Sequence, residues 1–174
     1  HNVGCVGTSV TEFWDNNISP HTLSKAIAAN NSRKNLYPAK ITKNDIESLI
    51  YYLEEDYEKY LNFKFCMNGT AMFDKSLLLK LGGWDGGTRI AADTDLFIRI
   101  LSLTDIHNIQ ECLYKRRFHK KSLTSLESCG IYSEPRKRYN LARVKVVKKV
   151  LKGEIINRNF YYPEVVYKVM KCVE

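Results

Sequence analysis

Apolar residues recur along the chain at spacings that predict strands in some segments and helices in others. Val3–Phe13 and Ile109–Phe118 are rich in β-branched and aromatic residues that partly alternate with polar ones, which is typical of strands. Phe63–Phe73 predicts two short strands joined by a turn that contains glycine. Residues 20–40 lack a clear period and are expected to be irregular, with at most a short helix over residues 23–29.

Four helices are predicted from apolar residues spaced three and four apart and from polar residues suited to capping. The first carries an apolar stripe that continues to about residue 60. The second is short and ends at Gly82, a residue type favoured just after a helix. The last is basic, has Pro135 in its first turn and stops at Gly153. The expected helix starts are Thr42, Asp74, Ala92 or Asp93, and Ser133.

The length and composition fit one domain with a packed core, since 44% of the 174 residues are hydrophobic. No apolar run is long enough to span a bilayer, and no signal peptide begins the sequence. The mixture of elements predicts an α/β or α+β fold, but so few strands would leave sheet edges uncovered. Because the chain also opens at His1 without a methionine, we expect a processed or truncated piece with more sheet upstream.

The five cysteines are scattered, odd in number and never spaced as a CxxC pair. That spacing disfavours both a zinc site and a disulfide framework. We therefore expect reduced thiols, which favours a cytosolic setting. The cysteines are Cys5, Cys66, Cys112, Cys129 and Cys172.

Much of the net charge of +8 is concentrated in the last predicted helix. A basic stripe of this kind suits nucleic acid, anionic lipid or nucleotide phosphates, and an ordinary solvated helix face is the alternative. Between Ser133 and Gly153, Glu134 is opposed by Arg136, Lys137, Arg138, Arg143, Lys145, Lys148, Lys149 and Lys152.

Three clusters of glycine and polar residues stand between the predicted elements. The first begins with MNGT at residues 67–70 and continues after the short helix as GGWD at residues 82–85. The second is ADTDL at residues 92–96, with Arg99 one turn later. The third is YKRRFH at residues 114–119, followed by SLT at residues 122–124.

Each cluster taken alone has an ordinary structural explanation. An aspartate at a helix start, such as Asp93, is most often a cap, and Asp95 is spaced to form an ion pair with Arg99. His119 alone indicates a surface imidazole, and Trp84 between glycines and an aspartate indicates a loop anchor.

In this order the clusters resemble the C-terminal half of inverting GT-A glycosyltransferases of family 2. Members of that family read as a glycine, a short helix, Gly-Gly-aromatic-Asp, an acidic pair opening D-x-D-L-x-x-R, then Y-R-x-H and S-L-T. The resemblance covers roughly residues 63–140, with Ala92 standing where the family has the first acidic residue of the pair. The matching residues are Gly69, Gly82, Gly83, Trp84, Asp85, Asp93, Asp95, Leu96, Arg99, Tyr114, Arg117, His119, Ser122, Leu123 and Thr124.

The resemblance implies a role for each of these positions. Asp93 would be the general base that takes the proton of the acceptor hydroxyl, because a sugar hydroxyl is a poor nucleophile. His119 would complete the shell of a Mn²⁺ or Mg²⁺ ion that neutralises the departing diphosphate. The acceptor would be bound by Asn68, Gly69, Trp84, Asp85 and Asp95, and the donor phosphates by Arg117, Ser122 and Thr124.

The implied fold is a partial GT-A fold of the α/β class, the C-terminal half of a mixed sheet with flanking helices. Residues 1–130 would form the acceptor-binding and catalytic half, and residues 131–174 a basic helix and tail packed on it. On this view the chain alone is inactive, because the nucleotide-binding half and its D-x-D motif would precede His1.

The leading hypothesis is an inverting glycosyltransferase that moves a sugar from a nucleotide donor to a glycan or lipid-linked saccharide. A cytoplasmic enzyme working at an anionic membrane surface would suit the basic helix, with Leu141, Val144, Val147 and Leu151 facing protein. The alternatives are a non-catalytic binding module, for carbohydrate or for nucleic acid through the basic helix. The absence of zinc spacing and of a helix-turn-helix pattern argues against nucleic acid as a partner.

Overall fold

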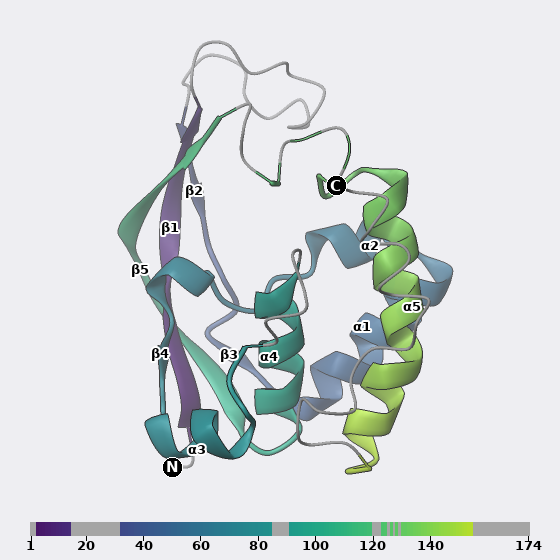
Figure 1. The fold of residues 1–174 in the computed structure, drawn as a ribbon. Coiled ribbons are helices and arrows are strands. Elements are labelled where there is room, and N and C mark those ends of the chain that lie inside the picture. Colours follow the sequence, from purple (N-terminus) through teal and green to yellow (C-terminus); the bar gives the residue numbers. More distant parts are fainter. Residues whose placement is uncertain are drawn as a thin grey trace.

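The chain forms a mixed α/β structure in which a curved sheet is covered on one side by helices (Figure 1). The computed structural model describes residues 3–14, 32–84, 91–119, 123–124, 126, 128 and 130–154. Its strands are β1 (Val3–Trp14), β2 (Ser32–Asn35), β3 (Lys40–Ile41), β4 (Met72–Phe73) and β5 (Asp105–Phe118). Its α-helices are α1 (Lys43–Glu55), α2 (Tyr57–Asn62), α3 (Lys75–Lys80), α4 (Ala92–Leu101) and α5 (Glu134–Leu151), with a 3₁₀ turn at Asn68–Thr70.

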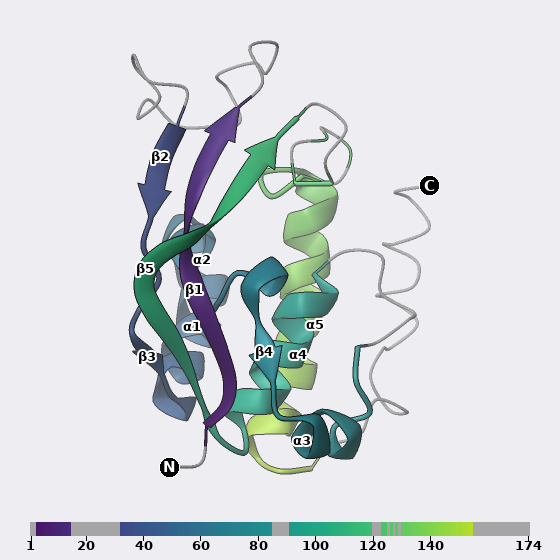
Figure 2. The same cartoon turned by 90° about the vertical axis from the view of Figure 1, so that its left-hand side faces the viewer.

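The two long strands β1 and β5 lie side by side and run parallel (Figure 2). Their register extends from Val3 opposite Asp105 to Trp14 opposite Phe118, with bulges on either side of Ser9. The short strands pair antiparallel to them: β2 and β4 with β1, and β3 with β5. The strand order is β2-β1-β5-β3, so a parallel pair forms the centre of a mixed sheet.

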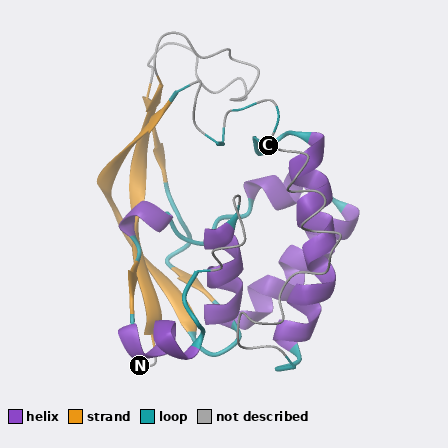
Figure 3. Ribbon diagram, in the orientation of Figure 1, coloured by secondary structure: helices purple, strands orange, loops and turns teal. Residues whose placement is uncertain are grey.

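The helix α4 lies between the sheet and α5, and α1 packs beside both of them (Figure 3). One apolar cluster joins all four elements, which makes the described part of α5 continuous with the main core. This cluster includes Cys5, Ile106, Ile46, Leu49, Leu53, Leu96, Phe97, Ile100, Val144, Val147 and Val150. No helix in the described ranges combines the length and apolar character that crossing a bilayer requires.

Capping side chains set most helix ends where the sequence predicts them. Asp74 accepts a hydrogen bond from the Leu77 amide at the start of α3, and Gly82 follows that helix with a φ of 76°. Ser133 likewise accepts from the Arg136 amide at the start of α5, and Gly153 follows it with a φ of 74°. These local predictions are confirmed.

The first predicted helix is interrupted, so the expectation of one helix to about residue 60 is wrong. Thr42 and Asp45 form a capping box at the start of α1, as the sequence indicates. At Asp56, however, the backbone leaves the helical region, and its carboxylate accepts from the Lys59 amide to begin α2. A single capping residue therefore divides the apolar stripe into two helices.

Two edge strands lie in the segment that was expected to be irregular. The strands β2 and β3 are too short to show an alternating hydrophobic pattern. They form because their backbone groups pair with the outer edges of β1 and β5. Conversely, the first half of Phe63–Phe73 is not a strand: residues 63–67 lie outside the ladders, and the Phe65 carbonyl accepts from Asn108 Nδ2 at 2.9 Å instead. The predicted strand Ile109–Phe118 begins earlier, at Asp105.

The apolar face of α5 differs in one position from the expected set. Val144 and Val147 are buried, and Leu151 is half-buried, as the spacing predicts. Leu141 is 38% exposed, which corrects its assignment to the protein-facing side. At that turn of the helix, the neighbouring Tyr139 and Asn140 occupy the buried face instead.

Of the cysteines, Cys5, Cys66 and Cys112 lie in the described part, and none of them forms a disulfide. A hydrogen bond with Cys66 and burial both raise the pKa of the Cys5 thiol. Gly7 packs against this thiol pair so closely that a Cβ there would lie 2.0 Å from Cys66 Sγ and 2.8 Å from Asn108 Oδ1.

We expect Gly7→Ala to lower the free energy of unfolding by about 1–3 kcal/mol, since overpacking forces a buried neighbour to move. Urea unfolding of the single variants and of Gly7→Ala/Cys66→Ala should show favourable coupling, because removing Sγ relieves the closest contact. Gly69→Ala, where the nearest atom is 3.3 Å away, is the control and should cost less. Strictly additive effects of the Gly7 and Cys66 changes would contradict the packing described.

Candidate active site

The start of α4 points toward the end of the sheet at which the parallel strands β1 and β5 finish. Residues 102–104 connect α4 directly to β5, so helix and strand run in opposite directions and the first turn of α4 is directed toward the end of the sheet where β5 finishes, while lying level with the middle of that longer strand (Figure 1). Ligands of open α/β sheets commonly bind at the carboxyl ends of parallel strands. The first turn of α4 faces that end of the sheet and carries both predicted aspartates, Asp93 and Asp95.

Asp93 presents its carboxylate at this helix start. The residue is half-buried, and its Oδ1 accepts a hydrogen bond of 2.8 Å from the Thr94 amide. Within the described residues its second oxygen has no hydrogen bond. Two positions before it, Ala91 adopts a left-handed φ of 56°, which is strained for a residue with a Cβ. A carboxylate held by one oxygen and open at the other can accept a proton from a bound hydroxyl.

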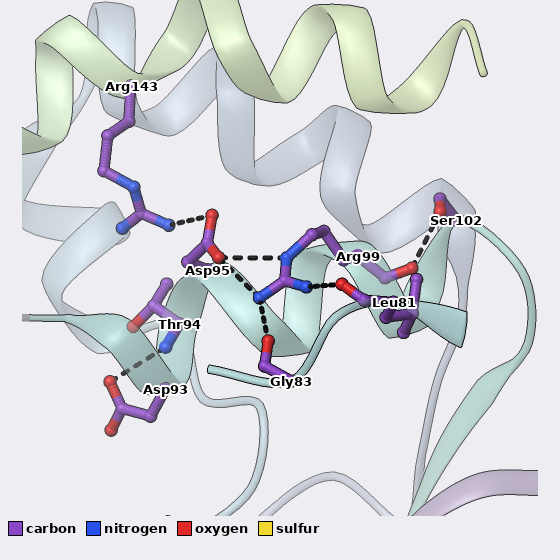
Figure 4. A network of polar contacts seen from close by, with 8 residues as sticks. All are labelled: Leu81, Gly83, Asp93, Thr94, Asp95, Arg99, Ser102 and Arg143. Carbon is purple, nitrogen blue, oxygen red and sulfur yellow. Dashed lines mark hydrogen bonds and ion pairs between the residues drawn. The ribbon is translucent and has the colours of Figure 1, made fainter. Parts of the chain in front are cut away.

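Asp95 has a different environment, although it is only two residues away. Figure 4 shows its carboxylate directed toward Arg99 and Arg143, whereas Asp93 points away from both. Asp95 Oδ2 accepts from Arg99 Nε at 3.0 Å and from Nη2 at 2.9 Å, and Oδ1 lies 3.8 Å from Arg143 Nη2. Asp95 is only 4% exposed. Asp95, which was expected to bind the acceptor, is therefore enclosed by two arginines. Its carboxylate holds the first turn of α4 in place.

Arg99 extends this network to the glycine turn that precedes Trp84. Its Nη1 donates to the Leu81 carbonyl at 2.5 Å and its Nη2 to the Gly83 carbonyl at 2.7 Å. The side chain has no exposed surface, so all of its described partners are internal. One guanidinium thus fixes the end of α3 and the Gly-Gly turn relative to the first turn of α4 (Figure 4).

The other predicted acceptor residues lie on two surface segments. Trp84 is 39% exposed, and its ring packs edge-on against Phe73 with 5.2 Å between centroids. Asn68 and Gly69 are exposed on the 3₁₀ turn, where a Cβ on Gly69 would approach the Tyr114 hydroxyl at 3.3 Å. The predicted residue Asp85 lies outside the described ranges.

The predicted phosphate and metal residues follow the end of β5. Arg117 is exposed and His119 half-buried, while Ser122 lies outside the described ranges. Thr124 Oγ1 accepts from Arg116 Nη2 at 3.3 Å. The Y-R-x-H motif gives Arg117 as the phosphate-binding arginine. In the structure its neighbour Arg116 is the arginine that contacts Thr124.

Arg116 belongs to a buried polar group that no sequence pattern indicated. It lies 3.5 Å from Glu12 Oε1, and its guanidinium stacks 4.4 Å from the Phe118 ring centroid. Glu12 is 1% exposed and also accepts from Asn35 Nδ2 at 2.9 Å, while Asn35 Oδ1 accepts from Lys64 Nζ. This network ties three strands together beside the candidate site.

Tyr37 is a further residue that sequence analysis missed. It is buried, its amide donates to Ser9 Oγ at 3.2 Å, and its hydroxyl donates to Met67 Sδ at 3.7 Å. Burial raises the pKa of its phenol to about 12; Arg116 opposes the shift, and the charges of Glu12 and Asp93 add to it. Tyr37 therefore lies within electrostatic reach of Asp93 and stays neutral near pH 7.

The described residues contain no cluster of three or more His, Cys, Asp or Glu side chains that could hold a metal ion. His119 is the one predicted ligand among them, so the Mn²⁺ or Mg²⁺ expectation stays a prediction and no chemical step is assigned to a metal.

Comparisons with protein-family models, with curated proteins and with solved structures found no match for this chain. A function for the site therefore rests on its geometry and on the order of its motifs.

We expect Arg99→Ala to lower the free energy of unfolding by about 3–5 kcal/mol, because it leaves the buried Asp95 carboxylate uncompensated. Arg138→Ala is the matched control: Arg138 pairs with Glu134 at the same spacing but on the surface, so its loss should cost at most about 1 kcal/mol. Chemical denaturation of both variants compares the two values. Similar small losses would show that the Asp95–Arg99 pair does not hold α4.

Proposed function

We propose that this chain carries the acceptor side of an inverting glycosyltransferase, with Asp93 as the general base. The observation that carries the proposal is the contrast between two aspartates in one helical turn. Asp95 is held by Arg99 and Arg143, whereas the second oxygen of Asp93 accepts no hydrogen bond from the described residues. A frame that fixes one carboxylate and leaves the other available suits a positioned base.

The proposed step is a single displacement at the anomeric carbon of a nucleotide sugar. The acceptor hydroxyl oxygen forms the new bond to that carbon while its proton passes to the open oxygen of Asp93. The bond to the nucleotide diphosphate breaks on the opposite face, and the diphosphate leaves with the bonding electron pair. The Thr94 amide holds the other oxygen of Asp93, so the carboxylate keeps its direction as the proton arrives.

Neighbouring residues would position the two substrates. Trp84 offers a partly exposed aromatic surface for a saccharide ring, and the backbone at Asn68 and Gly69 allows close approach. Arg117 and Thr124 stand at the end of β5, where they would meet the diphosphate. Asp85, Ser122 and His119 keep the roles that the resemblance implies as predictions.

The exposed face of α5 supports a second element of the proposal, contact with an anionic membrane surface. Lys145, Lys149 and Lys152 are exposed and make no ion pair with the described residues, while Lys148 pairs with Glu54 at 2.8 Å. The opposite face of the helix is anchored in the core by its valines. Such a helix lies on a charged surface through its lysines without inserting. A lipid-linked acceptor would bring the site to that surface.

We expect Asp93→Asn in the full-length gene product to lower sugar transfer by about 10²–10⁴-fold, since an amide cannot take the hydroxyl proton. Binding of the nucleotide sugar should be unchanged. The assay is transfer from a panel of UDP-sugars, with Asp74→Asn as the control because Asp74 only caps α3. Unchanged transfer by Asp93→Asn would reject the base assignment. Saccharide binding with no transfer by either protein would favour a non-catalytic carbohydrate-binding module.

We expect the triple variant Lys145→Gln/Lys149→Gln/Lys152→Gln to bind phosphatidylserine vesicles less tightly than the parent, by about 1 kcal/mol for each lysine removed. Co-sedimentation with phosphatidylserine and phosphatidylcholine vesicles measures the difference. Lys43→Gln/Lys75→Gln/Lys80→Gln, with the same charge loss on α1 and α3, is the control and should bind as the parent does. Equal losses in the two triple variants, or no preference of the parent for anionic vesicles, would contradict a membrane-facing α5.

A further inference from the structure

The 3₁₀ turn at residues 68–70 begins with an asparagine that is followed by a glycine. Asn68 and Gly69 are the one Asn-Gly pair in the sequence, and both are exposed. An asparagine can react with its own backbone, because the amide nitrogen of the next residue can reach the carbonyl carbon of its side chain. A glycine leaves that nitrogen accessible, since no Cβ stands beside it.

No hydrogen bond within the described residues holds either of the two reacting groups. The side-chain amide of Asn68 makes none, and the backbone amide of Gly69 donates to no carbonyl. The next two amides of the turn are bonded. Thr70 N donates to the Met67 carbonyl at 2.8 Å, and Ala71 N donates to the Asn68 carbonyl at 3.2 Å. The Asn68 side chain can therefore turn toward the Gly69 nitrogen without breaking a contact of its own.

The other asparagines of the described residues lack this combination. Three of them are buried and hold their side-chain amides in hydrogen bonds, namely Asn35, Asn108 and Asn140. Asn62 is exposed, but its Nδ2 donates to the Glu58 carbonyl at 3.0 Å. Asn44 is exposed on α1, and the nitrogen that follows it, the Asp45 amide, donates to the Thr42 carbonyl at 3.2 Å.

We propose that Asn68 is a site of deamidation through a cyclic imide. The Gly69 nitrogen gives up its proton to solvent and bonds to Cγ of Asn68. The bond from Cγ to the side-chain nitrogen breaks, and that nitrogen takes up a proton and leaves as ammonia. Water then opens the succinimide ring at one of its two carbonyls. One opening leaves an aspartate at position 68, and the other leaves an isoaspartate, in which the main chain runs through Cγ.

The modification changes a turn that contacts both central strands. Thr70 Oγ1 accepts from the Thr8 amide of β1 at 3.1 Å. The turn also packs on β5, because a Cβ on Gly69 would lie 3.3 Å from the Tyr114 hydroxyl. In the isoaspartyl form one more carbon lengthens the main chain, and the carbonyl that accepts from Ala71 becomes part of a carboxylate outside it. The contact between Thr70 and β1 should therefore weaken.

Ageing of the present chain in mildly alkaline buffer tests the site, and it requires no substrate, so its outcome is independent of glycosyl transfer. Mass spectrometry of tryptic peptides separates residues 65–75, which contain Asn68, from the peptides with Asn44 and Asn62. We expect the amide of Asn68 to become an acid about tenfold faster than the other two, because only Asn68 precedes a residue without a Cβ. An isoaspartyl methyltransferase should label the aged peptide. Equal rates at the three asparagines would overturn the proposal.

Gly69→Ala should slow the reaction about tenfold, since a Cβ shields the attacking nitrogen. Asn68→Gln should stop it, because the longer side chain forms the corresponding ring far more slowly. Asn62→Gln, the same change at another exposed position, is the control and should leave the rate at Asn68 unchanged. The synthetic peptide 65–75, with and without Gly69→Ala, repeats the comparison where folding plays no part. An unchanged rate in both Gly69→Ala molecules would reject the attack by this nitrogen.

Hydrogen exchange measures the effect on β1. In the isoaspartyl fraction, separated by ion exchange, the Thr8 amide should exchange faster than in the unmodified protein, because its acceptor on Thr70 has moved. The Leu77 amide, which donates to Asp74 at the start of α3, is the control and should exchange alike in both fractions. Equal exchange of the Thr8 amide in the two fractions would contradict the predicted loss of the contact.

Discussion

Arg99 has no contact with solvent, so its charge has to be balanced inside the protein, and Asp95 one turn earlier balances it. The same guanidinium donates hydrogen bonds to the carbonyls of Leu81 and Gly83, which follow the last turn of α3. One buried ion pair therefore fixes the glycine turn and the first turn of α4 together. Asp93 and Trp84 are carried by the two segments that this junction joins.

The sheet supplies the second constraint. Because β1 and β5 are parallel, their carboxyl ends meet on the same side, and α4, which runs opposite to β5, directs its first turn toward that side. Residues distant in sequence, among them Glu12, Asn35 and Arg116, then meet in a buried polar group beside this end. The short antiparallel strands cover parts of the edges of the two long strands.

The sequence predicts well the features that depend on residues close together in the chain, such as helix ends. Asp74 and Ser133 cap their helices because the bonded amides lie three residues away. The strands β2 and β3, and the burial of Tyr37, depend on partners far along the chain, and no local pattern carries that information. The spacing of Asp95 and Arg99 predicts their ion pair, and the structure confirms it. The approach of Arg143 to Asp95 depends on a helix far along the chain, which no local pattern indicates.

The proposed role of Asp93 as a general base implies one stereochemical outcome at the anomeric carbon. If Asp93 takes a proton and never bonds to the sugar, the acceptor attacks in one displacement and the configuration inverts. The most direct measurement is the anomeric configuration of the product, read by proton NMR from the full-length protein supplied with an α-linked nucleotide sugar. A β-linked product is the result that the assignment of Asp93 as general base predicts. An α-linked product would contradict it, because retention requires a different mechanism.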